Sequence, residues 1–131
     1  MLDCLIVGDS IAVGTADVKM ECESYAVGGI NSHDWNKRFQ NKSLISEAVI
    51  ISLGSNDIKH LNTEQELINL RKRVGAKRVY WILPANKPRK QEVVKRIAQT
   101  NGDIILPIKH LSKDHVHPTP MGYRELAKEI K

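Results

Sequence analysis

The sequence predicts an α/β protein, built as a three-layer sandwich around a parallel sheet of five strands. Short apolar runs, rich in β-branched residues, recur along the chain, and such runs suit strands that are covered on both faces. Segments with apolar residues at helical spacing lie between them, and this alternation is typical of right-handed βαβ units. Because we find no internal repeat and no linker, we expect one domain over residues 1–131.

The five predicted strands share one feature: each apolar run is followed directly by a glycine or a proline. They are residues 3–7, 24–27, 48–53, 79–83 and 104–106. Both residue types interrupt a ladder of strand hydrogen bonds, so they mark where each strand stops. The chain is therefore expected to turn at the same edge of the sheet five times.

A helix is predicted between the third and fourth strands. Thr63 is the expected N-cap, Glu66 completes a capping box, and Gly75 ends the helix. Residues 32–40 are a weaker helix candidate between the second and third strands.

Two further helices are predicted in the second half of the chain. Pro88 opens one of them, with apolar residues at helical spacing after it and Gly102 as its stop. The dipeptide Thr119-Pro120 opens the last helix, because Thr suits an N-cap and Pro suits the first helical position.

The composition is that of a soluble globular protein, with 41% hydrophobic and 27% charged residues among 131. No apolar run approaches the roughly 20 residues that a membrane helix needs, so no membrane partner is expected. Asp3 stands where a signal peptide carries positive charge. By default we therefore expect a cytoplasmic protein.

Cys4 and Cys22 are the two cysteines of the chain, and neither has metal-ligand spacing. In the absence of an export signal, two buried thiols are the default expectation. A disulfide between neighbouring strands stays open as the alternative.

The net charge of +5 comes largely from short cationic runs around the predicted helices. Such runs are more often solvated helix faces than binding sites. The chain has one Phe, three Tyr and two Trp, which is few for a surface that stacks nucleic-acid bases. These features argue against nucleic acid as a partner, although the charge could attract another anion.

Polar and glycine-rich segments follow the predicted strands. In an open parallel sheet, ligands bind at the carboxyl ends of the strands, so these segments are expected to share one rim. They are Gly8-Asp9-Ser10, Gly28-Gly29-Ile30-Asn31, Gly54-Ser55-Asn56-Asp57 and Asp114-His115-Val116-His117.

The residue types on this rim suit acyl transfer. Ser10 would be the nucleophile, His117 the base that takes its proton, and Asp114 the carboxylate that orients the imidazole. The backbone N–H groups of Ser10 and Gly29 and the side-chain amide of Asn56 would form an oxyanion hole. Together these residues predict a catalytic triad with three oxyanion donors.

This set of segments resembles the SGNH hydrolases, also called the GDSL family of esterases and lipases. Four blocks occur in the family's order: Gly8-Asp9-Ser10-Ile11, Gly29, Gly54-Ser55-Asn56-Asp57 and Asp114-His115-Val116-His117. The resemblance implies a flavodoxin-like sheet and ester hydrolysis through an acyl-enzyme on Ser10, with no metal and no cofactor. The chain is short for this family, so we expect a shallow site for short acyl groups, for example O-acetyl groups on a sugar or glycan.

Several alternatives remain open at this stage. Gly28 competes with Gly29 as the second block, and His115 competes with His117 as the base. A metal site could be formed instead by His110, Asp114, His115 and His117. Asp9 and Asp57 are expected to brace loops rather than to react.

The same triad could also serve an acyltransferase or a thioesterase. A non-catalytic module that binds an anionic glycan or nucleic acid is the alternative from a different class of function. It would have no need of Ser10, Asp114 and His117 together.

Overall fold

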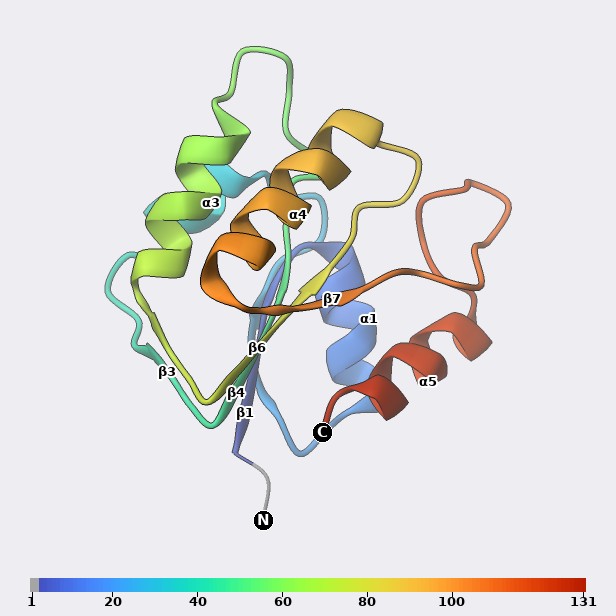
Figure 1. The fold of residues 1–131 in the computed structure, drawn as a ribbon. Coiled ribbons are helices and arrows are strands. Elements are labelled where there is room, and N and C mark those ends of the chain that lie inside the picture. Colours follow the sequence, from blue (N-terminus) through green and yellow to red (C-terminus); the bar gives the residue numbers. More distant parts are fainter. Residues whose placement is uncertain (1–2) are drawn as a thin grey trace.

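The computed structural model, which describes residues 3–131, contains a five-stranded parallel sheet with the order β2-β1-β4-β6-β7 (Figure 1). In this order β1 lies between β2 and β4, which are the next two strands of the sheet along the chain, and this is the flavodoxin-like pattern. The predicted fold class is confirmed. The strands are β1 (Cys4–Gly8), β2 (Glu23–Ala26), β4 (Ala48–Ser52), β6 (Arg78–Ile82) and β7 (Ile104–Leu106).

Helices cover both faces of the sheet and make the outer two layers. One face is packed by α1 (Ser10–Val18) and α5 (Pro120–Glu129). The other face is packed by α2 (Ser32–Arg38), α3 (Thr63–Lys72) and α4 (Pro88–Asn101). In Figure 1 the strands pass between these two groups of helices.

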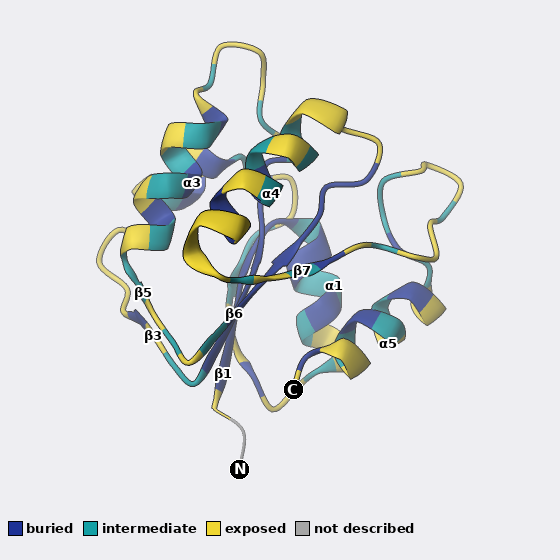
Figure 2. Ribbon diagram, viewed as in Figure 1, coloured by how far each residue is buried: buried dark blue, intermediate teal, exposed yellow. Residues whose placement is uncertain are grey.

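The period of two along each strand divides the core into two clusters. Along β1, Leu5 and Val7 join the cluster under α2, α3 and α4, whereas Cys4 and Ile6 join the cluster under α1 and α5. All five residues of β1 and of β4 are buried, as Figure 2 shows for the central strands. This double coverage explains why the strands read as continuous apolar runs instead of alternating ones.

The helix boundaries partly differ from the prediction. The helices that begin at Pro88 and Pro120 are confirmed, as is Gly102 as a left-handed C-cap with φ of 69°. In α3, however, the N-cap is Asn62, whose side chain accepts the Gln65 N–H. Thr63 as N-cap was therefore a wrong prediction.

The expected capping box and stop of α3 are also wrong. The Glu66 carboxylate accepts hydrogen bonds from His33 and Asn36 of α2, so it is not available to cap its own helix. The helix ends at Lys72, and Gly75 belongs to β5 (Val74–Gly75). That strand pairs with β3 (Leu44–Ile45) in a small second sheet. Strands of two residues are too short to produce a recognisable sequence pattern.

The pairing of β1 with β2 corrects the expectation of two free thiols. Cys4 and Cys22 form a disulfide, with their Cα atoms 4.7 Å apart. In the parallel register Leu5 is the partner of Glu23. The residues that precede these two, Cys4 and Cys22, therefore lie beside each other. Disulfides persist mainly in oxidising compartments, and the bond therefore weighs against the cytoplasmic expectation. Within residues 3–131, no helix is both long and apolar enough to cross a membrane.

The disulfide predicts a redox-dependent stability. It closes a loop with a sequence separation of 18, and a loop of this size is expected to contribute about 3 kcal/mol to the free energy of unfolding. Guanidinium unfolding with and without dithiothreitol measures this difference, and the Cys4→Ala/Cys22→Ala double variant serves as the control that should not respond to reductant. Alkylation of both cysteines in the denatured, unreduced protein would contradict the bond.

Candidate active site

The predicted site residues gather where the strand order reverses. Ser10 follows β1, Asn56 follows β4, and these neighbouring strands send their chains to opposite faces of the sheet. Such a reversal leaves a crevice outside the carboxyl ends of the strands, because the two following connections diverge. The topology therefore offers a ligand site at Ser10.

A close backbone approach positions Ser10. Gly8 has a φ of 143°, and a Cβ at this residue would lie 1.9 Å from the Ser52 carbonyl oxygen of β4. Only glycine allows this approach, in which the Asp9 N–H donates to the Ser52 carbonyl at 3.0 Å. Asp9 then caps α1 by accepting the Ile11 N–H, so Ser10 is the first residue of the helix. The helix α1 was not predicted from the sequence.

Ser10, His117 and Asp114 form a continuous chain of hydrogen bonds. The Ser10 hydroxyl lies 2.7 Å from His117 Nε2, and His117 Nδ1 lies 2.6 Å from Asp114 Oδ2. Because Nδ1 faces a carboxylate, it carries the proton, and Nε2 is left to accept the hydrogen bond of the serine hydroxyl. The expected contact between Ser10 and His117 is confirmed as geometry.

Hydrogen bonds hold Asp114 as an anion. The backbone N–H groups of His117 and Val116 both donate to Oδ1 at 2.9 Å, and the Ser112 hydroxyl donates at 2.8 Å. These donors, led by the His117 N–H, keep the pKa of the Asp114 carboxyl far below its usual range. The carboxylate therefore remains available to the imidazole across the neutral range.

Ser112 is a site residue that the sequence analysis missed. Its hydroxyl donates to Asp114, and its backbone N–H donates to the His117 carbonyl at 2.8 Å, so it closes the loop that carries both residues. A Ser two positions before an Asp is a known loop-bracing pattern, but it is too common to be assigned from sequence. The competing His115 has a φ of 59° and lies in the turn of this loop.

The metal alternative finds no support in the residues that the structure describes. Within residues 3–131, no group of three or more His, Cys, Asp or Glu side chains is arranged to hold a metal ion. His117 instead directs one ring nitrogen to Asp114 and the other to Ser10.

The second block forms a tight turn beside Ser10. The Ile30 N–H donates to the Val27 carbonyl at 3.3 Å, and Gly29 has a φ of 77°, as the third position of a type II turn requires. Gly28 is the nearer neighbour of the serine, since a Cβ at Gly28 would lie 4.0 Å from Ser10 Cβ. Gly29 would meet nothing within 4 Å.

Three groups on this rim have free donors. Across residues 3–131, neither the Ser10 N–H nor the Gly29 N–H donates a hydrogen bond. One N–H of the Asn56 amide donates to the Ile30 carbonyl at 3.1 Å, which ties the loop after β4 to the turn after β2 and leaves the second N–H unused. The residues named as oxyanion donors are thus brought to one edge of the sheet.

Asp57 fastens the same edge, as expected of a structural residue. Its carboxylate accepts the Ser32 N–H at 2.7 Å, the Ser32 hydroxyl, and the Thr63 hydroxyl at 2.7 Å. Ser32 and Thr63 begin α2 and α3, so one carboxylate ties both helix starts to the loop that carries Asn56.

Asp9 contrasts with the other carboxylates because it is buried. Its residue is 1% exposed, and burial raises the pKa of the carboxyl to about 6 despite hydrogen bonds from the Ile11 N–H and the Ser52 hydroxyl. Those donors reach Oδ1, and within the described residues Oδ2 has no partner. The residue directly before the serine thus carries a buried carboxyl with a raised pKa.

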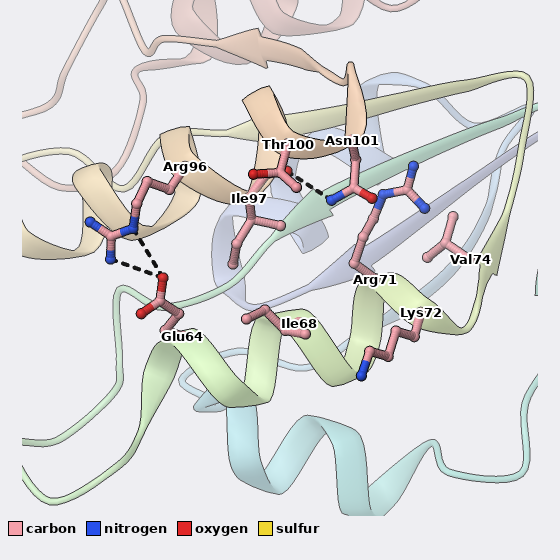
Figure 3. Close-up of a pocket in the computed structure, with 9 residues that line it drawn as sticks. All are labelled: Glu64, Ile68, Arg71, Lys72, Val74, Arg96, Ile97, Thr100 and Asn101. Carbon is pink, nitrogen blue, oxygen red and sulfur yellow. Dashed lines mark hydrogen bonds and ion pairs between the residues drawn. The ribbon is translucent and has the colours of Figure 1, made fainter.

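A hollow of about 450 Å³ lies away from this rim, between α3 and α4 (Figure 3). Ile68 and Ile97 face one another across it, and the Glu64–Arg96 ion pair closes one end. None of its lining residues is among the predicted site residues. Its Arg71 is held by Asp103 of the sheet edge through two hydrogen bonds, which is a structural role.

The fold is shared with solved structures. A candidate acylhydrolase from Bacteroides fragilis is 19% identical with a TM-score of 0.71, and the match covers 96% of this chain and 83% of that chain. A candidate GDSL-like lipase from Parabacteroides merdae is 16% identical with a TM-score of 0.71, covering 97% and 92%. No family model and no curated protein matches the sequence. At these identities the likeness concerns the fold, which is the one that the resemblance implied.

Burial of Asp9 predicts a pH-dependent stability. Because its folded pKa of about 6 lies above the unfolded value of about 3.9, the native state binds the proton more tightly, and ionisation between these values destabilises the fold. Relative to Asp9→Asn, the free energy of unfolding of the wild type should fall by about 2 kcal/mol from pH ~4 to pH ~7. Urea unfolding across this range measures it, with the exposed Asp17→Asn as the control. A constant difference would contradict the raised pKa.

Proposed function

We propose that the protein is a serine hydrolase that cleaves short-chain carboxylic esters through an acyl-enzyme on Ser10. The observation that carries this proposal is the unbroken chain from the Ser10 hydroxyl through His117 to Asp114, with contacts of 2.7 and 2.6 Å. A serine with a purely structural role would need no imidazole beside it, and an imidazole with a purely structural role would need no carboxylate held as an anion. The fold of the two solved structures is consistent with this reading.

The geometry suggests how each step would proceed. The Ser10 hydroxyl attacks the ester carbonyl while His117 Nε2 takes its proton, and Asp114 stabilises the resulting imidazolium through Nδ1. Collapse of the tetrahedral intermediate expels the alcohol, which receives the proton from His117 and leaves the acyl group on the serine oxygen. A water molecule, deprotonated by the same imidazole, then attacks the acyl-enzyme, and the imidazolium returns that proton to the Ser10 oxygen as the acid leaves.

The oxyanion would be stabilised by the free donors on the rim. The Ser10 N–H stands at the start of α1, where the helix dipole favours negative charge. The Gly29 N–H and the free N–H of Asn56 complete the set of candidate donors. This assignment uses N–H groups that have no acceptor within residues 3–131.

Short acyl groups suit the exposure of the site. The side chains of His117 and Asp114 are 40% and 50% exposed, so within residues 3–131 no apolar segment covers them fully. A long acyl chain gains binding free energy only where apolar surface can cover it. Acetyl groups, for example on a sugar or glycan, are therefore the proposed substrates.

The triad predicts the outcome of three substitutions. Ser10→Ala and His117→Ala should each lower the rate of p-nitrophenyl acetate hydrolysis by at least about 10³-fold, and Asp114→Asn should lower it by a similar factor, because the imidazole tautomer is no longer held. A fluorophosphonate probe should label the wild type and not Ser10→Ala. The exposed His115→Ala is the matched control and should retain the wild-type rate.

A wild type that neither turns over the ester nor accepts the probe would overturn the enzyme proposal. Acyl transfer to added alcohol in strong preference to water would instead identify an acyltransferase.

Asn56 provides a separate test of the oxyanion assignment. Asn56→Ala should lower kcat for p-nitrophenyl acetate by about 10²-fold with little change in KM, because the amide acts on the charge that develops after binding. The neighbouring Ser55→Ala is the control. A proportional rise in KM with unchanged kcat would show that Asn56 only shapes the binding surface.

A further inference from the structure

A second hollow borders the turn that lies beside Ser10. It has a volume of about 470 Å³ and lies between the turn of residues 27–30 and one face of α2. Three charged residues of α2, Asp34, Lys37 and Arg38, line it. Their spacing of three and four residues places them on the same side of the helix.

The charge of this hollow is unbalanced. Lys37 and Arg38 are exposed, and within residues 3–131 neither forms an ion pair. Arg38 has its guanidinium carbon 5.9 Å from the centre of the Phe39 ring, which holds it without neutralising it. Asp34 is the one carboxylate in the lining, and it is bonded to Asn31 at the start of α2. The two cations therefore exceed the fixed negative charge.

The hollow includes one proposed oxyanion donor, Gly29, and the neighbour of Ser10, Gly28. Gly28 lies against Ser10, at 4.0 Å between a Cβ built on Gly28 and Ser10 Cβ, and Gly29 carries a free N–H. Both glycines also line the hollow. A substrate whose carbonyl lies at Ser10 and whose alcohol part extends over this turn would therefore enter the hollow that Lys37 and Arg38 line.

We propose that this hollow is a subsite for an anionic group, a carboxylate, sulfate or phosphate, on the alcohol part of the ester. This inference rests on the proposed esterase function, because a short acyl group such as acetyl carries no charge and leaves the alcohol part as the bearer of the anion. Lys37 and Arg38 would then be specificity-determining residues that attract acidic alcohols, for example acetylated acidic sugars. The exposure of both cations predicts a modest, salt-sensitive preference.

The test compares phenyl acetate with 4-acetoxybenzoate, which differs by one carboxylate on the leaving alcohol. At low ionic strength the wild type should favour the anionic ester in kcat/KM, and Lys37→Gln/Arg38→Gln should reduce that preference about fivefold. The Lys72→Gln/Lys128→Gln variant removes the same two charges from exposed positions outside the hollow and should keep the wild-type preference. Addition of about 0.5 M salt should reduce the preference in the wild type.

Binding to Ser10→Ala separates this inference from the esterase proposal. By NMR titration, the variant should bind 4-acetoxybenzoate more tightly than phenyl acetate, with shifts at Lys37 and Arg38. If this preference is present while the wild type hydrolyses neither ester, the subsite stands and the esterase proposal fails. If the ratio of kcat/KM for the two esters is the same before and after substitution of Lys37 and Arg38, the subsite is overturned. A preference for monophenyl succinate, which carries the charge on the acyl part, would also overturn it.

Discussion

The arrangement of the candidate site depends on the contact between the ends of β1 and β4. At Gly8 the two backbones come so close that a single Cβ would meet the Ser52 carbonyl oxygen at 1.9 Å. At this contact the Asp9 N–H donates to the Ser52 carbonyl, and the Asp9 carboxylate accepts a hydrogen bond from the Ser52 hydroxyl. These two bonds fix the direction in which the chain leaves the sheet. The helix α1 begins at once, and its first residue is the serine. The hydroxyl of Ser10 thus stands directly after a strand whose five residues are all buried.

Two carboxylates near the serine have opposite environments and opposite pKa shifts. Burial dominates at Asp9 and raises its pKa to about 6, whereas several donated hydrogen bonds dominate at exposed Asp114 and lower its pKa. The difference suits the proposed roles. The carboxyl that must remain an anion beside His117 is stabilised as one, and the carboxyl beneath α1 needs only to accept two hydrogen bonds at Oδ1.

The site is assembled from loops that are tied to one another rather than enclosed. Asn56 joins the loop after β4 to the turn after β2, and Asp57 joins the same loop to the starts of α2 and α3. The loop with Asp114 and His117 is closed separately, through Ser112. Such ties let a chain of 131 residues hold side chains from three distant segments without long covering loops. The same arrangement leaves the side chains of His117 and Asp114 partly exposed, and the charged residues of α2 line a hollow that borders the turn beside Ser10.

The sequence by itself determined the strands, the order of the site segments and the residues that meet at the rim. Double burial makes strands continuous apolar runs, and a parallel sheet sends their carboxyl ends to one edge, so Ser10, Asn56 and His117 could be grouped without coordinates. Only the tertiary structure decided what depends on register and on contacts between distant segments. Cys4 and Cys22 are bonded because the β1–β2 register places them side by side, and Glu66 serves α2 instead of capping α3 because the two helices pack together. Local pattern carries no information on such pairings, since the partners are fixed by packing across the sheet and not by spacing along the chain.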